Sequence, residues 1–264
     1  MNKITMTSTQ KQSIIFSAQK LIDILEIIAE AKSSKTVNDV VDICGMSRPN
    51  AYRYLMTLQN NGYVLQNDDG SYHLGPKLLY LAKQYLIQFN WLQAAQDIMK
   101  ELSQISNETV HMGILDETEI VYMARVDSPQ SIRMFSEIGS RNPVHCTAMG
   151  KALLAFMDNN LRESILSQID LEPKTENTIT NVSELRNELE IIKKNGYAID
   201  NIENEDGVRC IGTVINNAYG QVVCALSISG PAFRLNLENL KDLSVPLIDA
   251  AKRISQVYEH QAMN

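Results

Sequence analysis

Several features that define whole classes of protein are missing from this chain. No run of apolar residues approaches the ~18 needed to cross a bilayer as a helix. The N-terminal stretch MNKITMTSTQKQS is polar and lacks the apolar centre of a secretion signal. The four cysteines, at positions 44, 146, 210 and 224, form no C-x-x-C pair and no disulfide-type cluster. We therefore expect a cytoplasmic protein that is not associated with a membrane.

An excess of positive charge is also missing. The 264 residues carry a formal net charge of −7, which is unfavourable for binding nucleic acid. The charge is unevenly distributed, because residues 1–75 hold seven basic and seven acidic side chains and are neutral. The length suggests two domains, and a hydrophobic content of 44% can give each a packed core. The acidic charge then belongs to a second domain that need not touch nucleic acid.

Residues 36–75 predict a winged helix-turn-helix. Apolar residues recur at helical spacing from Val37 to Cys44, and Gly45 ends this helix. Ser47 is the expected N-cap of a second helix, in whose first turn Pro49 is tolerated. After that helix, the segments 63–66 and 71–74 alternate like paired strands around a turn at 68–70.

The second helix has the side chains expected of a DNA reader. In a helix-turn-helix the N-terminal part of this helix enters the major groove, where Arg matches guanine and Asn matches adenine. No acidic residue lies between Asp42 and Asp68. An ordinary solvated helix in a small helical domain is the alternative. The residues expected to contact double-stranded DNA are Thr36, Ser47, Arg48, Asn50, Tyr52 and Arg53. Because one neutral copy would bind weakly, we expect at least a dimer.

The remaining chain predicts a linker helix and an α+β domain. A helix at 17–31 completes the first domain (1–75), and a linker helix at 77–89 lies in the segment 76–89. In residues 90–264, a helix beginning at Leu92 precedes expected strands at 109–115, 119–126 and 131–138. Helices at 147–157, 161–168 and 182–195, strands at 197–202, 208–216 and 221–229 and a helix at 237–259 follow. This order favours a mostly antiparallel sheet.

Three segments of the second domain could bind a ligand. In 142–152, Thr147 can cap a helix that begins with small residues. These residues either leave backbone N–H groups open to a carboxylate or phosphate, or only allow the helix start to pack tightly against the sheet. The acidic run 200–211 could bind a metal or a hydroxylated ligand, although a solvated loop is the ordinary interpretation. In 223–231, Ser227 and Ser229 share one strand face and would suit a polar ligand if that face is covered.

Catalysis and metal binding are weaker alternatives. Cys146 follows His145 directly, and neighbours on an extended segment point to opposite sides, so another base such as His111 would be needed. Soft ligands from His145, Cys146, Cys210 and Cys224 could converge on zinc without any C-x-x-C support. We expect no catalytic activity, no metal and no cofactor.

The motifs resemble the IclR family of bacterial transcriptional regulators. SRPNAYRYL, NGYV and YHLG resemble its DNA-binding domain, and GSRNPVHCTAMGKALLA, GYAIDNIENEDGVRCIG and ALSISGP resemble its effector domain. In detail the chain is most similar to the KdgR-type branch, which responds to 2-keto-3-deoxygluconate. Within the recognition helix, the family commonly has a Lys and two small hydroxyl residues where this chain has Arg48, Pro49 and Asn50, so the operator sequence does not carry over.

The resemblance implies a GAF-like α/β effector domain that binds a small carboxylate metabolite, and assembly into homodimers or tetramers. A sugar acid, or a keto acid from another carbon-source pathway, would then control a repressor. The effector-binding positions implied by the motifs are Met134, Asn142, Ala148, Met149, Asp200, Val208, Cys210, Ser227 and Ser229, with Cys146 and Thr147 at the helix start. Glu203, Glu205 and Asp206 are expected to stay solvated.

Overall fold

The structure is a computed structural model and describes residues 15–31, 33–87, 91–132, 134 and 136–262. The chain divides into two compact units, Met1–Phe89 and Asn90–Asn264. The finer division at residues 75 and 76 stays a prediction. In the ranges described, none of the helices combines the length and the apolar character needed to cross a bilayer.

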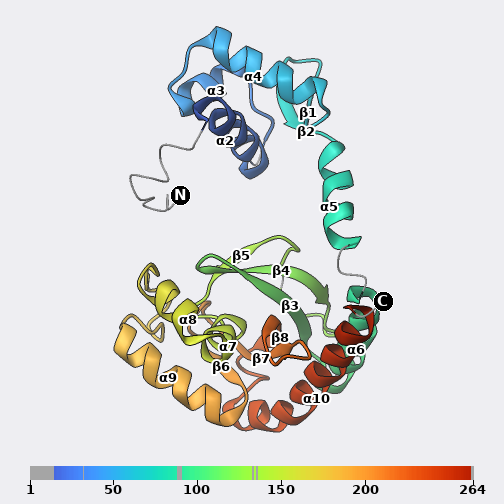
Figure 1. Ribbon diagram of the computed structural model, residues 1–264, viewed down its shortest axis with the longest axis vertical. Helices are drawn as coiled ribbons and strands as arrows, with labels where there is room; N and C mark the ends of the chain where they lie inside the picture. The colour runs from blue at the N-terminus through green and yellow to red at the C-terminus, as the bar shows by residue number, and fades with distance from the viewer. Residues whose placement is uncertain (1–14, 32, 88–90, 133, 135, 263–264) are drawn as a thin grey trace. The chain divides into compact units, whose positions relative to one another are not determined.

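The N-terminal unit contains a small helical core and a two-stranded wing (Figure 1). Its elements are α2 (Phe16–Glu30), α3 (Val37–Cys44), α4 (Arg48–Asn60), β1 (Val64–Gln66), β2 (Tyr72–Leu74) and α5 (Lys77–Ile87). The core is formed by buried side chains of Ile24, Ile28, Val40, Ala51, Leu55, Leu58, Val64 and Tyr72. This is the winged helix-turn-helix that the sequence predicts.

The turn between α3 and α4 forms for local reasons. Thr36 and Asp39 build a capping box, in which the Asp39 N–H donates to Thr36 Oγ1 at 3.3 Å and the Thr36 N–H donates to the Asp39 carboxylate at 2.7 Å. Gly45 ends α3 at φ +61°, a left-handed conformation. Ser47 occupies the N-cap position of α4, but its side chain makes no capping hydrogen bond. Its carbonyl instead accepts the N–H groups three and four residues further on, so the hydroxyl is not the cap that the sequence suggested.

The C-terminal unit is an α+β domain built on one six-stranded antiparallel sheet, in the order β5-β4-β3-β8-β7-β6. Its strands are β3 (Thr109–Asp116), β4 (Glu119–Val126), β5 (Arg141–Pro143), β6 (Ala198–Asn201), β7 (Val208–Asn216) and β8 (Val222–Pro231). Its helices are α6 (Leu92–Ser106), α7 (Ala148–Phe156), α8 (Asn159–Leu166), α9 (Val182–Asn195) and α10 (Leu237–Ala262).

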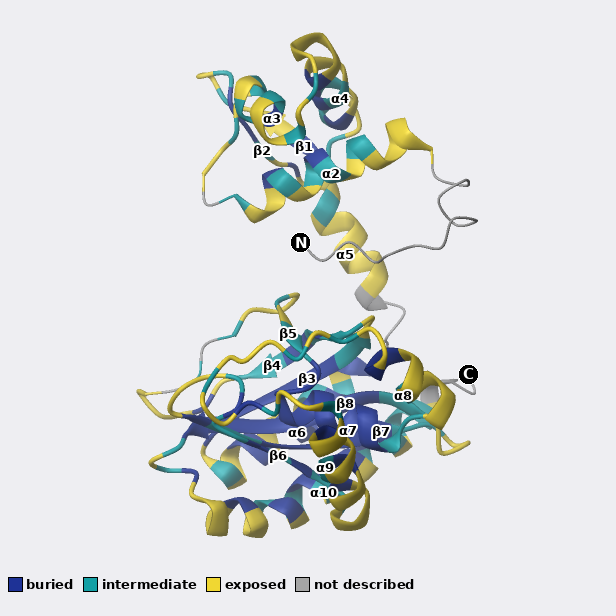
Figure 2. Cartoon of the chain, turned by 90° about the vertical axis from the view of Figure 1, so that its left-hand side faces the viewer, coloured by how far each residue is buried: buried dark blue, intermediate teal, exposed yellow. Residues whose placement is uncertain are grey.

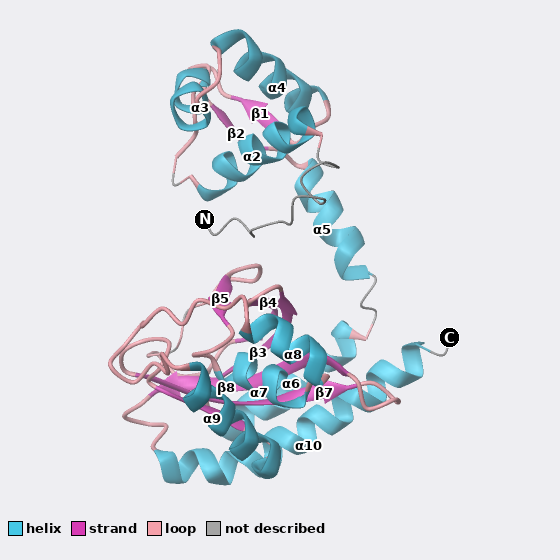
Figure 3. Cartoon of the chain, turned by 60° about the vertical axis from the view of Figure 1, so that its left-hand side comes forward, coloured by secondary structure: helices cyan, strands magenta, loops and turns pink. Residues whose placement is uncertain are grey.

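Two helical layers cover this sheet. Helix α7 packs on β6, β7 and β8 and is itself backed by α9, while α6 and α10 pack together on the other face (Figure 3). The central strands β3, β7 and β8 are therefore largely buried (Figure 2). The expected fold class is confirmed. Apart from one strand, the elements expected from the sequence are present, with ends that differ by a few residues.

The prediction of a strand at 131–138 is wrong. The described residues of this stretch form a loop, and the edge strand is β5, which pairs with β4; residues 133 and 135 lie outside the described part. Arginine side chains bind carbonyls of the loop in place of a neighbouring strand. Arg234 Nη2 donates to the Ile132 carbonyl at 2.8 Å, and Arg125 donates to the Ser136 carbonyl. The two arginines lie 102 and 11 residues away from the carbonyls that they bind. The alternation of polar and apolar residues within 131–138 gives no indication of such contacts.

Candidate functional site

The outward side of α4 presents the side chains expected at DNA. Arg48, Asn50, Tyr52 and Arg53 are all exposed, whereas the inward stripe of the same helix is buried. Thr36 is exposed at the start of α3, where its hydroxyl belongs to the capping box.

A groove of about 550 Å³ runs between the starts of α3 and α4 and the wing. Its lining consists of Thr36, Val37, Asn38, Arg48, Pro49, Tyr52, Gln66, Asp69 and Gly70. Ser47, Asn50 and Arg53 lie outside this lining. Asp69 was not expected there. Its carboxylate accepts hydrogen bonds from the Ser71 N–H at 2.9 Å and from the Ser71 hydroxyl at 2.6 Å, and these bonds hold the turn of the wing. A recognition helix beside a wing is the arrangement with which this motif docks on duplex DNA.

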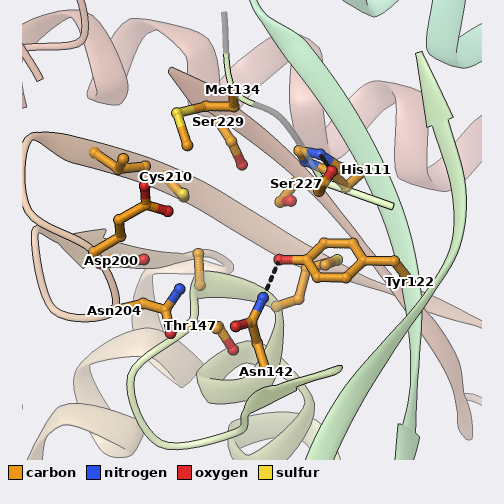
Figure 4. A pocket seen from close by; sticks show the side chains of 15 residues that line it. His111, Tyr122, Met134, Asn142, Thr147, Asp200, Asn204, Cys210, Ser227 and Ser229 are labelled. Carbon is orange, nitrogen blue, oxygen red and sulfur yellow. Dashed lines mark hydrogen bonds between the residues drawn. The ribbon is translucent and has the colours of Figure 1, made fainter. Parts of the chain in front are cut away.

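The C-terminal unit contains a polar cavity of about 60 Å³ between the sheet and the start of α7 (Figure 4). Its lining consists of His111, Tyr122, Met134, Ser136, Asn142, Thr147, Ala148, Met149, Asp200, Asn204, Glu205, Val208, Cys210, Ser227 and Ser229. Every residue expected at the effector site is in this lining except Cys146. The Cys146 side chain is fully buried, and its thiol donates to Asn204 Oδ1 at 3.4 Å.

The first turn of α7 combines tight packing with access to the cavity. The Thr147 hydroxyl accepts the N–H of Gly150 at 3.1 Å, as the capping prediction requires. A Cβ at Gly150 would lie 2.2 Å from the Val144 carbonyl oxygen, so a larger residue would displace the helix start. Ala148 and Met149 line the cavity. Because N–H groups at the first helical positions have no partner within the helix, this turn can bind an anion.

Two rows of residues across the sheet form the floor of the cavity. The strand register aligns Asp200 with Cys210 and Ser229 across β6, β7 and β8. The next row aligns Gly212 with Ser227 and His111 across β7, β8 and β3. The hydroxyls of Ser227 and Ser229 therefore share the covered face, as the alternation in β8 predicts.

Asp200 is a buried acceptor at one side of this cavity. Its side chain is almost inaccessible, and Oδ1 accepts the N–H of Glu203 at 2.7 Å. Burial raises the pKa of Asp200 to about 7, against the opposing effect of that backbone hydrogen bond. The cavity lining contains the carboxyl groups of Asp200 and Glu205 but no Lys or Arg. The ionised form of Asp200, which predominates above about pH 7, suits a hydroxyl donor better than a second anion.

Glu203, which we expected in solvent, is buried in an ion pair. Lys151 Nζ on α7 lies 2.6 Å and 2.7 Å from its two carboxylate oxygens, and Asn201 N–H donates to Oε1 at 3.1 Å. The pair fixes the turn after Asp200, in which Ile202 adopts φ +62°, an uncommon conformation for a β-branched residue. A lysine inside the apolar stretch of α7 was the only sequence signal for a buried partner.

The thiol and zinc alternatives find no support in this geometry. Burial, and secondarily Asp200, raise the pKa of the Cys146 thiol to about 12, so it is not a thiolate nucleophile at neutral pH. His145 Nε2 lies 3.2 Å from the Glu172 carbonyl oxygen, whereas that thiol lies against Asn204 Oδ1 and the Pro143 carbonyl. Cys224 and Cys210 occupy positions of opposite parity in the paired strands and face opposite sides of the sheet. Within the described residues, no group of three or more His, Cys, Asp or Glu side chains is placed to hold a metal.

Five polar residues of the lining were not expected at the site: His111, Tyr122, Ser136, Asn204 and Glu205, the last of which we expected only in solvent. His111 had been considered only as a possible base. The sequence holds a usable signal for His111, because it is a polar residue in the middle of the strand β3. A polar residue on a covered strand face needs a hydrogen-bond partner. Ser136 had been assigned to the strand that is absent.

A winged helix-turn-helix joined to an α+β domain defines a DNA-binding regulator. Comparison with family models makes the assignment specific. The model for the bacterial transcriptional regulator IclR C-terminal domain matches residues 83–256, and the IclR helix-turn-helix domain matches residues 17–68. The chain belongs to the IclR family, and it is a transcriptional regulator that binds operator DNA rather than an enzyme.

Individual relatives agree with this assignment. The transcriptional regulator KdgR of Dickeya chrysanthemi is 36% identical over 255 residues, which cover 96% of this chain and 83% of that protein. KdgR of Escherichia coli K12 is 36% identical over 242 residues, covering 91% and 92%. The crystal structure of the Thermotoga maritima IclR is similar at 37% identity with a TM-score of 0.74, covering 91% of this chain and 97% of that one.

Proposed function

We propose that this regulator is a repressor whose operator binding is controlled by a small carboxylate metabolite, with sugar acids of the 2-keto-3-deoxygluconate type as the first candidates. The polar cavity at the start of α7 carries this proposal. The likeness to KdgR supports the choice of sugar acids. A regulator of bacterial operators acts where the chromosome lies, in the cytoplasm.

The cavity offers a hydroxylated monoacid complementary groups. The N–H groups of Ala148 and Met149 bind its carboxylate at the helix terminus, and the hydroxyls of Ser227 and Ser229 bind its other oxygens. Ionised Asp200, which predominates above about pH 7, accepts hydrogen bonds from sugar hydroxyls and repels a second carboxylate. A short keto acid from another pathway would use the helix start and leave Asp200 without a hydroxyl partner. Because a cavity of about 60 Å³ holds only several waters, the flexible Met134 side chain moves when a six-carbon acid binds.

Assembly is the second part of the proposal. A neutral winged helix makes too few phosphate contacts to hold DNA alone, so two copies bind a pseudo-palindromic operator. Helix α5 supports a dimer seam, because Leu79 is 76% exposed and Tyr80, Leu81 and Tyr85 are exposed beside it. We expect a dimer or a dimer of dimers in sedimentation at micromolar concentration. A monomer that still holds its operator tightly would contradict this.

Thermal melting tests the effector proposal. A ligand at a hundred times its dissociation constant stabilises the folded protein by about 2.7 kcal/mol, which shifts the melting temperature measurably. Wild type and a Ser227→Ala, Asp200→Ala double variant are screened against sugar acids, keto acids and dicarboxylates. We expect a sugar acid to shift the wild type and not the double variant. The pocket assignment fails if no acid shifts the wild type, or if both proteins respond alike.

A further inference from the structure

The cavity has two chemically different ends. Asp200 lies on β6 at one side, whereas His111 and Tyr122 lie on β3 and β4 at the other (Figure 4). Glu205, which also lines the cavity, belongs to the loop after β6. In the sheet order β6 and β3 are separated by β7 and β8, and Asp200 and His111 lie in neighbouring rows. Three strand spacings and a two-residue offset put their backbones roughly 16 Å apart. A ligand that spans the cavity therefore meets carboxyl groups at one end and a histidine and a phenol at the other.

His111 carries a buried polar atom that has no hydrogen-bond partner among the described residues. The side chain is 2% exposed and lines the cavity. Its Nε2 lies 2.6 Å from Ser136 Oγ, within hydrogen-bond distance. Its Nδ1 is buried and finds no hydrogen-bond partner in the described part of the chain. Burial, and secondarily Arg125, lower the pKa of His111 to about 3, so the ring is neutral. If the Ser136 hydroxyl donates to Nε2, Nδ1 carries the proton and is a donor without an acceptor among the described residues.

Tyr122 supplies a second donor beside it. Its ring meets the His111 ring edge-on, with the centroids 5.1 Å apart. Its oxygen accepts from Asn142 Nδ2 at 3.1 Å, and burial raises its pKa, so the hydroxyl keeps its own proton. The hydrogen bonds of the described residues include no acceptor for that proton. Two neutral residues of the cavity lining thus have a polar atom for which the described residues provide no hydrogen-bond acceptor.

Charge separates the ends further. Arg125 is the register partner of His111 on β4 and donates to the Ser136 carbonyl, which places a guanidinium next to the donor end. At the other end a ligand carboxylate would meet Asp200 and Glu205. Gly212, in the same row as His111, lets the start of α7 approach the sheet, since a Cβ there would lie 3.0 Å from Met149 N. The helix start and His111 therefore flank the same stretch of the floor.

We propose that His111 Nδ1–H and Tyr122 Oη–H are effector contacts that bind the carboxylate, together with the first turn of α7, and orient the effector with its hydroxyls toward Asp200. This inference rests on the proposed function, since it takes a hydroxylated acid as the ligand. It adds an orientation and two residues that neither the motifs nor the family resemblance assigned.

Two substitutions of His111 separate its nitrogens. Asn places an amide nitrogen near the position of Nδ1 and loses Ser136, whereas Gln reaches the position of Nε2 and loses the free donor. Calorimetric titration of the full-length protein with 2-keto-3-deoxygluconate is expected to give a roughly ten- to hundredfold weaker affinity for His111→Gln, and an affinity close to wild type for His111→Asn. A merely structural histidine would make both variants lose affinity alike, and that result, or no loss in either, overturns the assignment.

Pyruvate tests the orientation, because it has the keto-acid end without the hydroxyls. His111→Gln is expected to weaken both acids by the same factor, whereas Asp200→Asn weakens only the sugar acid. The opposite pattern reverses the proposed orientation. If the wild type binds neither acid, the effector class fails and this inference fails with it; if it binds them without regard to His111, only this inference fails.

Spectroscopy gives a readout that needs no affinity. The chain has four histidines, so ¹⁵N-histidine spectra identify the His111 signals by their loss in His111→Gln. We expect a neutral ring protonated at Nδ1 from about pH 5 to pH 8, and a change at Nδ1 when 2-keto-3-deoxygluconate is added. A ring protonated at Nε2 in the free protein would overturn the proposal.

Discussion

Replacing Lys151 by Met should be among the most destabilising single changes in the C-terminal domain. The ammonium group is fully buried on α7, 2.6 Å from one Glu203 oxygen and 3.7 Å from a Glu188 oxygen. Met preserves the length and apolar volume of the side chain and leaves Glu203 buried without its cation. Breaking a buried ion pair in this way costs about 3–5 kcal/mol. The magnitude follows from burial, because an exposed pair would contribute less than about 1 kcal/mol.

The pH dependence distinguishes this cause from a packing defect. Desolvation raises the pKa of Glu203 even with Lys151 present, and removing the lysine raises it further. A carboxyl whose folded-state pKa is raised loses stability as the pH rises above its unfolded value. The Lys151→Met variant should therefore approach wild type near pH 4.5 and fall away toward pH 8. The double variant Lys151→Met, Glu203→Gln should recover part of the loss, because no charge is then buried unpaired.

Urea unfolding measured by tryptophan fluorescence suits this test. Trp91 is the only tryptophan and is buried at the start of α6, edge-on to Tyr258 with the centroids 5.4 Å apart, so it reports on the C-terminal domain. A loss below about 1 kcal/mol at pH 8, or a double variant no more stable than the single one, would refute the reasoning.

Three further outcomes follow from the same contacts. The stability of wild type relative to Asp200→Asn should fall as the pH rises from the unfolded pKa of 3.8 to the folded pKa of about 7, because Asp200 holds its proton in this range only when folded. The expected fall is up to ~1.4 kcal/mol per pH unit. Denaturation at several pH values that gives the same pH dependence for both proteins would contradict the raised pKa. Gly212→Ala should cost about 1–3 kcal/mol by overpacking, because its Cβ would lie 2.9 Å from the Ala148 carbonyl carbon; an unchanged melting temperature would count against the close approach of α7. Arg48→Ala or Arg53→Ala should weaken operator binding by about 1–3 kcal/mol for a base contact, or flatten the salt dependence for a phosphate contact. Unchanged affinity and an unchanged salt dependence in both variants would show that α4 is not the recognition helix.

The sequence predicts those parts of the structure that depend on neighbours along the chain. The helix-turn-helix and wing follow from local spacing, from Gly45 and from the turn at 68–70. The Thr147 cap is likewise local, since donor and acceptor lie three residues apart. The covered strand face of Ser227 and Ser229 follows from simple alternation once the sheet is accepted.

The features that the sequence missed depend on tertiary contacts. Glu203 looked like part of a solvated acidic loop, and only its meeting with Lys151, 52 residues away, makes burial tolerable. The segment 131–138 has strand-like alternation, but Arg234 reaches its Ile132 carbonyl from 102 residues away. The position of His111 beside Ser227 depends on the register of β3 against β8, which is set by the assembled sheet. The periodicity of residues along the chain does not predict pairings between residues that are distant in sequence.

Operator release by an acid tests the central claim most directly. A fluorescent duplex from the region upstream of the gene is titrated with the full-length protein at one fixed salt concentration, with and without saturating 2-keto-3-deoxygluconate, and anisotropy gives both dissociation constants. Coupling between two sites typically changes an affinity by 5–150-fold, so we expect the acid to weaken operator binding by about tenfold or more. An operator affinity that stays the same with this acid and with the other sugar and keto acids of the panel would contradict an effector-controlled repressor.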